Sequence, residues 1–258
     1  RRAAQPLHLH HAQSRRRRAR AQPRGTNGRF VQRHLRGTGL IGVPDRNPDA
    51  AARSSEAAAP GAPGSGAAAP TTAENVAIYG LYVGATHTLT KAPVTSVDLV
   101  AGVGVVGDVH AGPTVRHRSR VRVDPNKPNL RQVHLTSLAT YEMLTEMGID
   151  VGPGSIGENV CLAGVQLLDL PTGTVLRLGA HDDAPLVALT GLRNPCVQLD
   201  ALHANLKAAL APTDPTAPEG IRHRAGVFAV VLRGGTVNHA DAVTYTLPPP
   251  PHAELRRV

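Results

Sequence analysis

Hydrophobic residues recur over most of the chain in short runs, separated by glycine, proline and polar turn residues. Runs of this length that are rich in Val, Leu and Ile predict β-strands. They lie at 76–83, 94–100, 132–135, 159–162, 174–178, 185–190, 226–233 and 236–246. Because only two segments have helical spacing, the pattern predicts a mainly β domain with helical insertions, built as a β-barrel-like sheet.

The two helical segments are placed by their capping residues. The first covers 137–147, where Thr136 or Ser137 can cap the start and Gly148 suits the end. The second covers 195–210, and its apolar residues recur on adjoining turns: Leu199, Leu202, Leu206 and Leu210.

Residues 1–72 lack this hydrophobic pattern. They hold 13 of the 28 Lys and Arg residues and three acids, and they are rich in Ala, Pro and Gly. Such a segment cannot bury enough apolar surface to offset chain entropy, so we expect a disordered basic tail and linker. The remainder, 73–258, is expected to be one folded domain. The charge of +9 therefore belongs to the tail, and we expect no specific nucleic-acid partner for the nearly neutral domain.

The composition narrows the cellular setting. The chain has no apolar run of 18 residues and no apolar segment after its first arginines, so we expect neither a membrane span nor a secretory signal. Its two cysteines do not make a disulfide framework, which favours the cytoplasm. Scarce aromatic residues weigh against a base-stacking surface.

The segment TGLRNPCVQL contains the strongest chemical candidate, Cys196. Asn194 can cap a helix and Pro195 fits its first position, which places Cys196 in the first turn, where the helix dipole favours a thiolate. Arg193 adds a cation that could stabilise the thiolate or bind an anion. Such a thiolate could be a nucleophile, a persulfide carrier or a soft metal ligand. The alternative is a small apolar residue in the core, which is our expectation for Cys161.

Two glycine-rich segments carry further polar candidates. GDVHAG places Asp108 and His110 two residues apart, where they could form an acid/base pair, a metal site or an anion contact. PGSIGENV offers Glu158 and Asn159, of which Asn could bind a ligand and Glu could equally hold its own loop together. His134, in a strand-like run, is expected to be a satisfied core histidine. The long polar segment 113–131 predicts an irregular excursion.

Motifs of the common enzyme classes are absent from the sequence: no P-loop, dinucleotide fingerprint, HExxH, GxSxG or CxxC occurs. Taken in order, however, the blocks KAPVTSVDLV, GVVGDVHAG, RQVHLTSLATYEML, PGSIGENV, LPTGTVLRLG, TGLRNPCVQL and RAGVFAVVLRGG resemble a MOSC domain, the module named for the C-terminal part of molybdenum cofactor sulfurases. The most specific elements are GEN at 157–159 and R-x-P-C at 193–196. The resemblance runs from about residue 76 to 258.

The resemblance implies a MOSC-type β-barrel that binds molybdenum cofactor (molybdopterin). It assigns Cys196 the role of molybdenum ligand or sulfur carrier. It also assigns Arg193, Asp108, His110, Glu158 and Asn159 to the cofactor cleft. Relatives with a single domain imply reduction of N-hydroxylated compounds with an electron-donor protein. No pyridoxal phosphate is expected, because the aminotransferase-like domain of the full sulfurases is missing from this sequence.

Two alternatives to a molybdenum oxidoreductase remain open. One is a non-catalytic module in which Cys196 carries a persulfide from a sulfur-donor protein to a cofactor or partner. The other is a scaffold whose thiol is buried. One block also departs from the family, since Ala240 stands where Gly usually precedes Asp, so we expect the turn at that corner to be reshaped.

Overall fold

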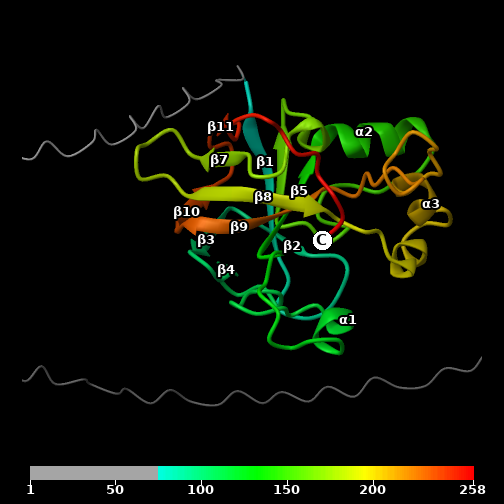
Figure 1. Cartoon of the computed structure of the whole chain (residues 1–258), viewed down its shortest axis with the longest axis horizontal. Coiled ribbons are helices and arrows are strands. Elements are labelled where there is room, and N and C mark those ends of the chain that lie inside the picture. The colour runs from blue at the N-terminus through cyan, green and yellow to red at the C-terminus, as the bar shows by residue number, and fades with distance from the viewer. Residues whose placement is uncertain (1–74) are drawn as a thin grey trace, which may run out of the picture. The chain divides into compact units, whose positions relative to one another are not determined.

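The computed structural model describes residues 75–258, so the tail predicted for 1–72 lies outside the described residues. Most of the strands belong to one sheet of eight, in the order β11-β7-β8-β9-β5-β6-β1-β2 (Figure 1). Their bounds are β1 Ala77–Val83, β2 Ala92–Val94, β5 Val133–Ser137, β6 Val160–Ala163, β7 Val175–Leu178, β8 Leu186–Leu192, β9 Val227–Arg233 and β11 Val243–Thr246. A second sheet, in the order β10-β3-β4, contains β3 Ser96–Val100, β4 Gly104–Val105 and β10 Gly235–Asn238.

The helices are short: α1 Arg118–Val121, α2 Leu138–Glu146, α3 Leu206–Leu210, and the 3-10 helices η1 Leu167–Asp169 and η2 Val197–Ala201. Helix α2 connects β5 to β6, which are parallel, whereas the other ladders are antiparallel. A parallel pair cannot be joined by a tight turn, and α2 supplies the crossover. Figure 1 shows α2 and α3 on one side of the large sheet and α1 on a loop below it.

The interior has two hydrophobic clusters. One lies between the two sheets and includes Ile78, Leu135 and Leu162 of the large sheet with Val97 and Val237 of the small one. The other lies beneath the helices and includes Tyr141, Leu199 and Leu206. Cys161, fully buried, belongs to this second cluster, as expected for a packing residue. Polar side chains in the loops at the ends of the strands lie outside these two clusters and are available to form a site.

The prediction of a mainly β fold with helical insertions is confirmed, but the large sheet is not a closed barrel. Strand β1 approaches the start of β11 at one isolated bridge, Ala77 to Ala242. The predicted strands at 94–100 and 236–246 are each two strands in the structure, with interruptions before Ser96 and after Asn238. The helix predicted at 137–147 is α2, and Gly148 follows it with a φ of 74°.

The predicted helix at 195–210 is wrong. It is divided into η2 and α3, because Asn205 takes a left-handed conformation with a φ of 70°. Asparagine tolerates this conformation better than most residues, and it breaks the helical ladder. Cys196 is consequently the residue before a 3-10 helix of five residues, and it does not lie in the first turn of a long α-helix.

Ala240, which replaces the Gly that usually precedes Asp in the family, lies in the turn between β10 and β11. Ala240 has a φ of 66°, a left-handed conformation that glycine adopts without cost. The corner nevertheless keeps its pairing, because the Ala240 N–H donates to the carbonyl oxygen of Ile78 over 3.0 Å. The side chain at this position therefore leaves the turn in place but strains it.

We expect Ala240→Gly to raise the free energy of unfolding by about 0.5–1 kcal/mol. Relief of the left-handed strain, about 1–2 kcal/mol, exceeds the added entropy of glycine in the unfolded chain. Urea denaturation measures the difference. The control Ala188→Gly, in the middle of β8, should lower stability by about 0.5–1 kcal/mol; a loss of stability in both variants would contradict the strain.

Candidate functional site

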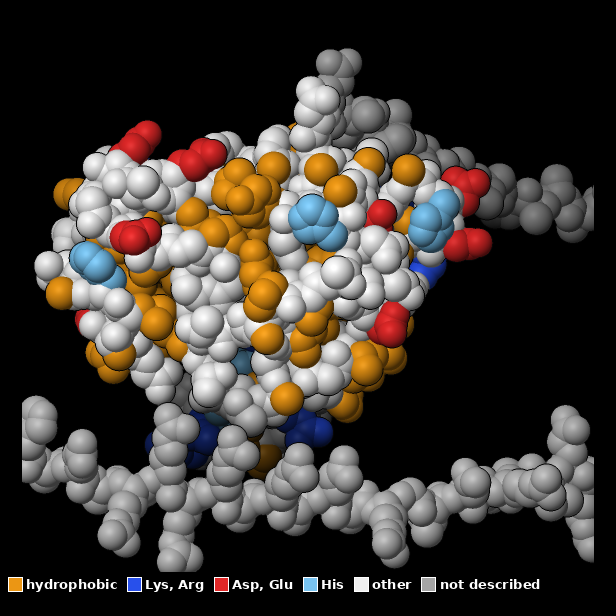
Figure 2. Space-filling model, turned by 180° about the vertical axis from the view of Figure 1, so that it is seen from behind, with side chains coloured by type: hydrophobic (Ala, Val, Ile, Leu, Met, Phe, Trp, Pro, Cys, Tyr) orange, Lys and Arg blue, Asp and Glu red, His pale blue; other side chains and the backbone are white. Residues whose placement is uncertain are grey.

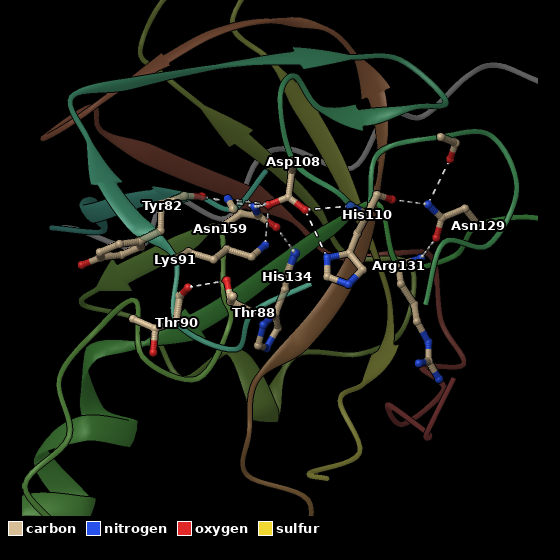
Figure 3. Close-up of polar contacts among 12 residues, drawn as sticks. Tyr82, Thr88, Thr90, Lys91, Asp108, His110, Asn129, Arg131, His134 and Asn159 are labelled. Atoms are coloured by element: carbon tan, nitrogen blue, oxygen red, sulfur yellow. Dashed lines mark hydrogen bonds and ion pairs between the residues drawn. The ribbon is translucent and has the colours of Figure 1, made fainter. Parts of the chain in front are cut away.

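The carboxylate of Asp108 lies at the centre of a buried polar cluster (Figure 3). Lys91 Nζ lies 2.6 Å from Asp108 Oδ2, and Asn159 Nδ2 donates to the same oxygen over 2.8 Å. The backbone N–H of His110 donates to Oδ1 over 2.9 Å, and its Nδ1 lies 3.2 Å from that oxygen. The predicted pairing of Asp108 with His110 is thus present, together with three further partners from other segments: Lys91, Asn159 and the Gly84 N–H, which donates to Oδ2 over 3.3 Å.

Asp108 is held in its ionised form. Burial alone would raise the pKa of this carboxyl group, but the hydrogen bonds from His110 and the charge and hydrogen bond of Lys91 hold the pKa well below its usual range. Burial also lowers the pKa of Lys91, and Asp108 opposes this shift. Asp108 is therefore a structural anion, and a role as proton donor does not fit its surroundings.

Asn159 and Glu158 both serve the local structure. Asn159 Oδ1 accepts the N–H of His134 over 3.2 Å, and its Nδ2 donates to the carbonyl oxygen of Tyr82 over 3.2 Å, so it joins β5 to β1. Glu158 is fully buried and accepts hydrogen bonds from the Tyr141 hydroxyl and, over 2.5 Å, from the Gly154 N–H. Glu158 therefore holds its own loop together, which was the alternative interpretation of this residue.

Arg193 is a buried cation without an ion-pair partner among the described residues. It is 9% exposed, and its Nη1 is buried without a hydrogen-bond partner. Its backbone N–H donates over 3.0 Å to the carbonyl oxygen of Gly226. Gly226 has a φ of 92°, and a Cβ there would collide with the carbonyl oxygen of Leu135, so glycine is required where β9 begins.

Two more buried nitrogen atoms near Arg193 lack partners: Nδ1 of His117 and Nη2 of Arg131. Burial lowers the pKa of His117 to about 2, with further lowering by the positive charges of His110, Arg131, Arg193 and Lys91. We call Lys91, Arg131 and Arg193, together with the neutral His117 that lies among them, the cationic cluster. Its members act on one another, and only Lys91 has a carboxylate partner.

Aromatic contacts join the cationic cluster to the sheet. The rings of His110 and His117 stack with centroids 4.3 Å apart, and His117 meets Phe228 of β9 at 5.6 Å. The Arg131 guanidinium lies 5.1 Å from the Phe228 ring centre. His134 Nε2 lies 2.8 Å from the carbonyl oxygen of Ala225, so this histidine is satisfied in the core, as expected.

Cys196 lies in extended backbone, with a φ of −108° and a ψ of 162°. Its side chain is partly exposed, and its Sγ is 3.8 Å from Gln198 Oε1. Burial lowers the pKa of Arg193, and the nearby charge of Cys196 offsets part of this effect. The macrodipole of a long helix is missing here, so the electrostatic neighbour of the thiol is Arg193.

The structure thus divides the predicted site residues into two groups. Asp108, His110 and Asn159 form one connected cluster, whereas within residues 75–258 no side-chain hydrogen bond or ion pair joins Glu158, Arg193 or Cys196 to it. Within residues 75–258, no group of three or more His, Cys, Asp or Glu side chains could hold a metal ion. The same part of the chain has no helix able to span a membrane.

Lys91, His117 and Arg131 were missed by the sequence interpretation. Each is a basic residue in or beside a loop, and its burial depends on strands that are distant in the sequence. Lys91 directly precedes β2 within the block KAPV, and this position was the only available signal.

Comparisons with known proteins agree with the fold. A family model described as MOSC domain matches residues 107–244. No curated protein matches the sequence. Among solved structures, YuaD from Bacillus subtilis is similar with a TM-score of 0.52 and 22% identity, over 66% of this chain and 94% of that chain. YiiM from Escherichia coli gives a TM-score of 0.46 and 16% identity, over 69% of this chain and 73% of that chain.

We expect Asp108→Asn to lower the free energy of unfolding by about 3–5 kcal/mol near neutral pH, because Lys91 is left buried without its anion. Since the pKa of Asp108 is lowered by folding, its contribution is present above the unfolded pKa of about 3.9 and is lost as the pH falls towards the folded pKa. The gap between wild type and variant should therefore narrow in acid. Urea denaturation at several pH values measures it.

The matched control is Asp182→Asn, which removes a fully exposed carboxylate and should change stability by no more than about 0.5 kcal/mol. If the two aspartate variants lose stability equally, the buried network does not stabilise the fold in the way described.

Iodoacetamide should label Cys196 in the native protein and leave Cys161 unlabelled. Cys196 is partly exposed, whereas Cys161 is fully buried and its pKa is raised to about 12, chiefly by burial. Intact mass and peptide mapping measure the labelling, with Cys196→Ser as the control. A native protein that resists labelling at Cys196 would support the scaffold with a buried thiol.

Proposed function

The chain belongs to the MOSC domain family, and on this premise we propose that it binds the molybdenum cofactor. Arg193 and Arg131 would hold the anionic phosphate of the molybdopterin, and Cys196 would be the protein's ligand to molybdenum. The observation that carries the proposal is the buried Arg193 guanidinium, which has no partner for Nη1.

The donor set of the cationic cluster fits an anion. A buried cation is stable only when it is paired or hydrogen-bonded. Arg193, Arg131 and His117 each leave a buried nitrogen atom without a partner, and these atoms belong to mutually interacting groups. A phosphate group accepts several charge-assisted hydrogen bonds and suits the planar fork of arginine. One bound phosphate would compensate the cluster.

Cys196 fits the metal. Thiolate sulfur is a soft ligand, and its metal affinity depends on loss of the thiol proton. Arg193 lies close enough to act electrostatically on Cys196, so one side chain would face both the metal ligand and the bound anion. The partly exposed side chain of Cys196 leaves the sulfur open to a ligand on the solvent side.

When bound, the cofactor would supply oxygen-transfer and redox chemistry. The substrate class we propose is an N-hydroxylated compound, whose reduction to the amine takes two electrons and two protons and releases water. The electrons require an electron-donor protein, and the cytoplasm is the compartment we propose. The chain's own residues would bind and orient: Asp108 would keep the loop of His110 in place, and the His110–His117 stack would cover the cationic cluster.

A second candidate function is a persulfide carrier without catalysis of its own. It is favoured by the surroundings of Cys196, whose Sγ has one weak contact, to Gln198. A thiol in this setting is accessible to a sulfur-donor protein. Arg193 would then stabilise the terminal persulfide anion, and the same side chains would serve a different transfer.

We expect the full chain, purified from a host that makes the cofactor, to contain nearly one molybdenum per protein. Cys196→Ser should lose most of the metal because the soft ligand is gone. Arg193→Gln should contain about tenfold less molybdenum than wild type because charge-assisted hydrogen bonds to the cofactor are lost. Cys161→Ala and Arg177→Gln are the matched controls and should keep the wild-type content. Mass spectrometry of the metal measures all five proteins.

The result distinguishes the two functions. Unchanged molybdenum in Cys196→Ser, or little metal in wild type, would reject ligation by this residue. In the latter case, wild type treated with a sulfurtransferase should gain one sulfur in intact mass, and Cys196→Ser should gain none. If neither assay gives the expected result, the remaining interpretation is a scaffold in which Cys196 has no chemical role.

A further inference from the structure

A second basic feature lies outside the cationic cluster, around α1. A surface cavity of about 490 Å³ is lined by His87, Val109, Arg116, Arg118, Val121 and Arg122. We call it the arginine pocket. Its wall contains three guanidinium groups, one imidazole and two valine side chains, and it contains no carboxylate. Figure 2 shows Lys and Arg side chains gathered at the lower end of the molecule, where α1 lies in Figure 1.

The geometry of α1 directs these side chains to one face. Arg118, Val121 and Arg122 are spaced i, i+3 and i+4, so they share a side of the helical turn. Arg120 lies on a different side, and its Nη2 donates over 3.4 Å to Val258 O. Helix α1 and its C-cap therefore place Arg118 and Arg122, but not Arg120, in the wall of the pocket.

Arg116 completes the wall because Gly112 makes room for it. A Cβ at position 112 would lie 2.6 Å from Nε of Arg116, so only glycine allows the side chain to lie over the backbone there. His87 also lines the pocket, and its ring lies 5.3 Å from that of His110. The pocket is thus built from segments that already hold the candidate site together.

The arginines of the pocket have no anion. Within residues 75–258, none of Arg116, Arg118 and Arg122 has a carboxylate within ion-pair distance. The acid that follows them in the sequence, Asp124, accepts the N–H of Asn126 over 2.9 Å instead. Arg118 and Arg122 are exposed and one helical turn apart, so they repel each other weakly, and a bound anion would relieve this repulsion.

We propose that the arginine pocket binds a small molecule that carries a phosphate or diphosphate group. Guanidinium forks match phosphate oxygens, and the two valines offer contact to the apolar part of such a molecule. The volume lies in the range of small-molecule sites, about 300–1,000 Å³. A concave wall with valines suits a small ligand better than the backbone of a nucleic acid. The proposal does not depend on molybdenum binding at Cys196.

The probe is inorganic pyrophosphate, titrated by calorimetry into the full chain. Wild type should bind it with an affinity that falls as salt is added. The double variant Arg118→Gln/Arg122→Gln should bind at least about tenfold more weakly, because two charge-assisted contacts are lost. Arg256→Gln removes an exposed arginine that lies outside the pocket and should bind like wild type.

The same titration is repeated with Arg118→Lys/Arg122→Lys, which keeps both charges but loses the planar guanidinium groups. Its affinity for pyrophosphate should lie between those of wild type and the Gln double variant. Thermal unfolding checks that each variant folds. If the Gln double variant does not fold, the pyrophosphate affinity of the Lys double variant tests the proposal. Pyrophosphate affinity equal in wild type and both double variants would overturn the proposal. A duplex oligonucleotide whose binding is lost in the variants, while pyrophosphate binding is kept, would also overturn it in favour of nucleic acid.

Discussion

The buried carboxylate of Asp108 is the interaction on which the region depends. A charge in the interior is tolerated only with close partners, and here they come from separate segments: Lys91 before β2, Asn159 before β6 and His110 in the loop itself. Each segment is fixed by the need to satisfy one anion. Because Asp108 holds His110, the ring of His117 that stacks on His110 is held in place as well.

The cationic cluster is assembled so that its charges outnumber its anions. Asp108 pairs with Lys91, and Glu158 accepts hydrogen bonds from Tyr141 and Gly154 through Oε1. The charge of Glu158 acts on Arg193, but neither Arg193 nor Arg131 has a carboxylate within ion-pair distance among the described residues. A fold that maximised its own stability would pair these charges. Their arrangement is typical of a site whose last partner is a ligand.

Much of the fold follows from local patterns, and the site follows from them only in part. Short apolar runs bounded by glycines identified the strands, and Gly148 marked the end of α2. The leucine spacing at 195–210 predicted one continuous helix. This prediction is wrong because the left-handed Asn205 interrupts the helix at a point where the periodicity alone continues. Asp108 and His110 are close in sequence, so their pairing was predictable. Lys91 and Arg131 become neighbours of the site only through strand pairing, which no local pattern contains.

The bridge from Ala77 to Ala242 bears on how the chain is made. During synthesis β1 leaves the ribosome early, but its partners in β6 and around residue 242 follow only much later. Contacts between residues so far apart give a high contact order, which slows folding. One edge of β1 can pair early with β2, but the edge that later pairs with β6 must remain unpaired in the meantime and is exposed to aggregation. The loop of Asp108 is completed only when its distant partner Asn159 has been made, so the buried polar cluster forms after the first half of the domain has been translated.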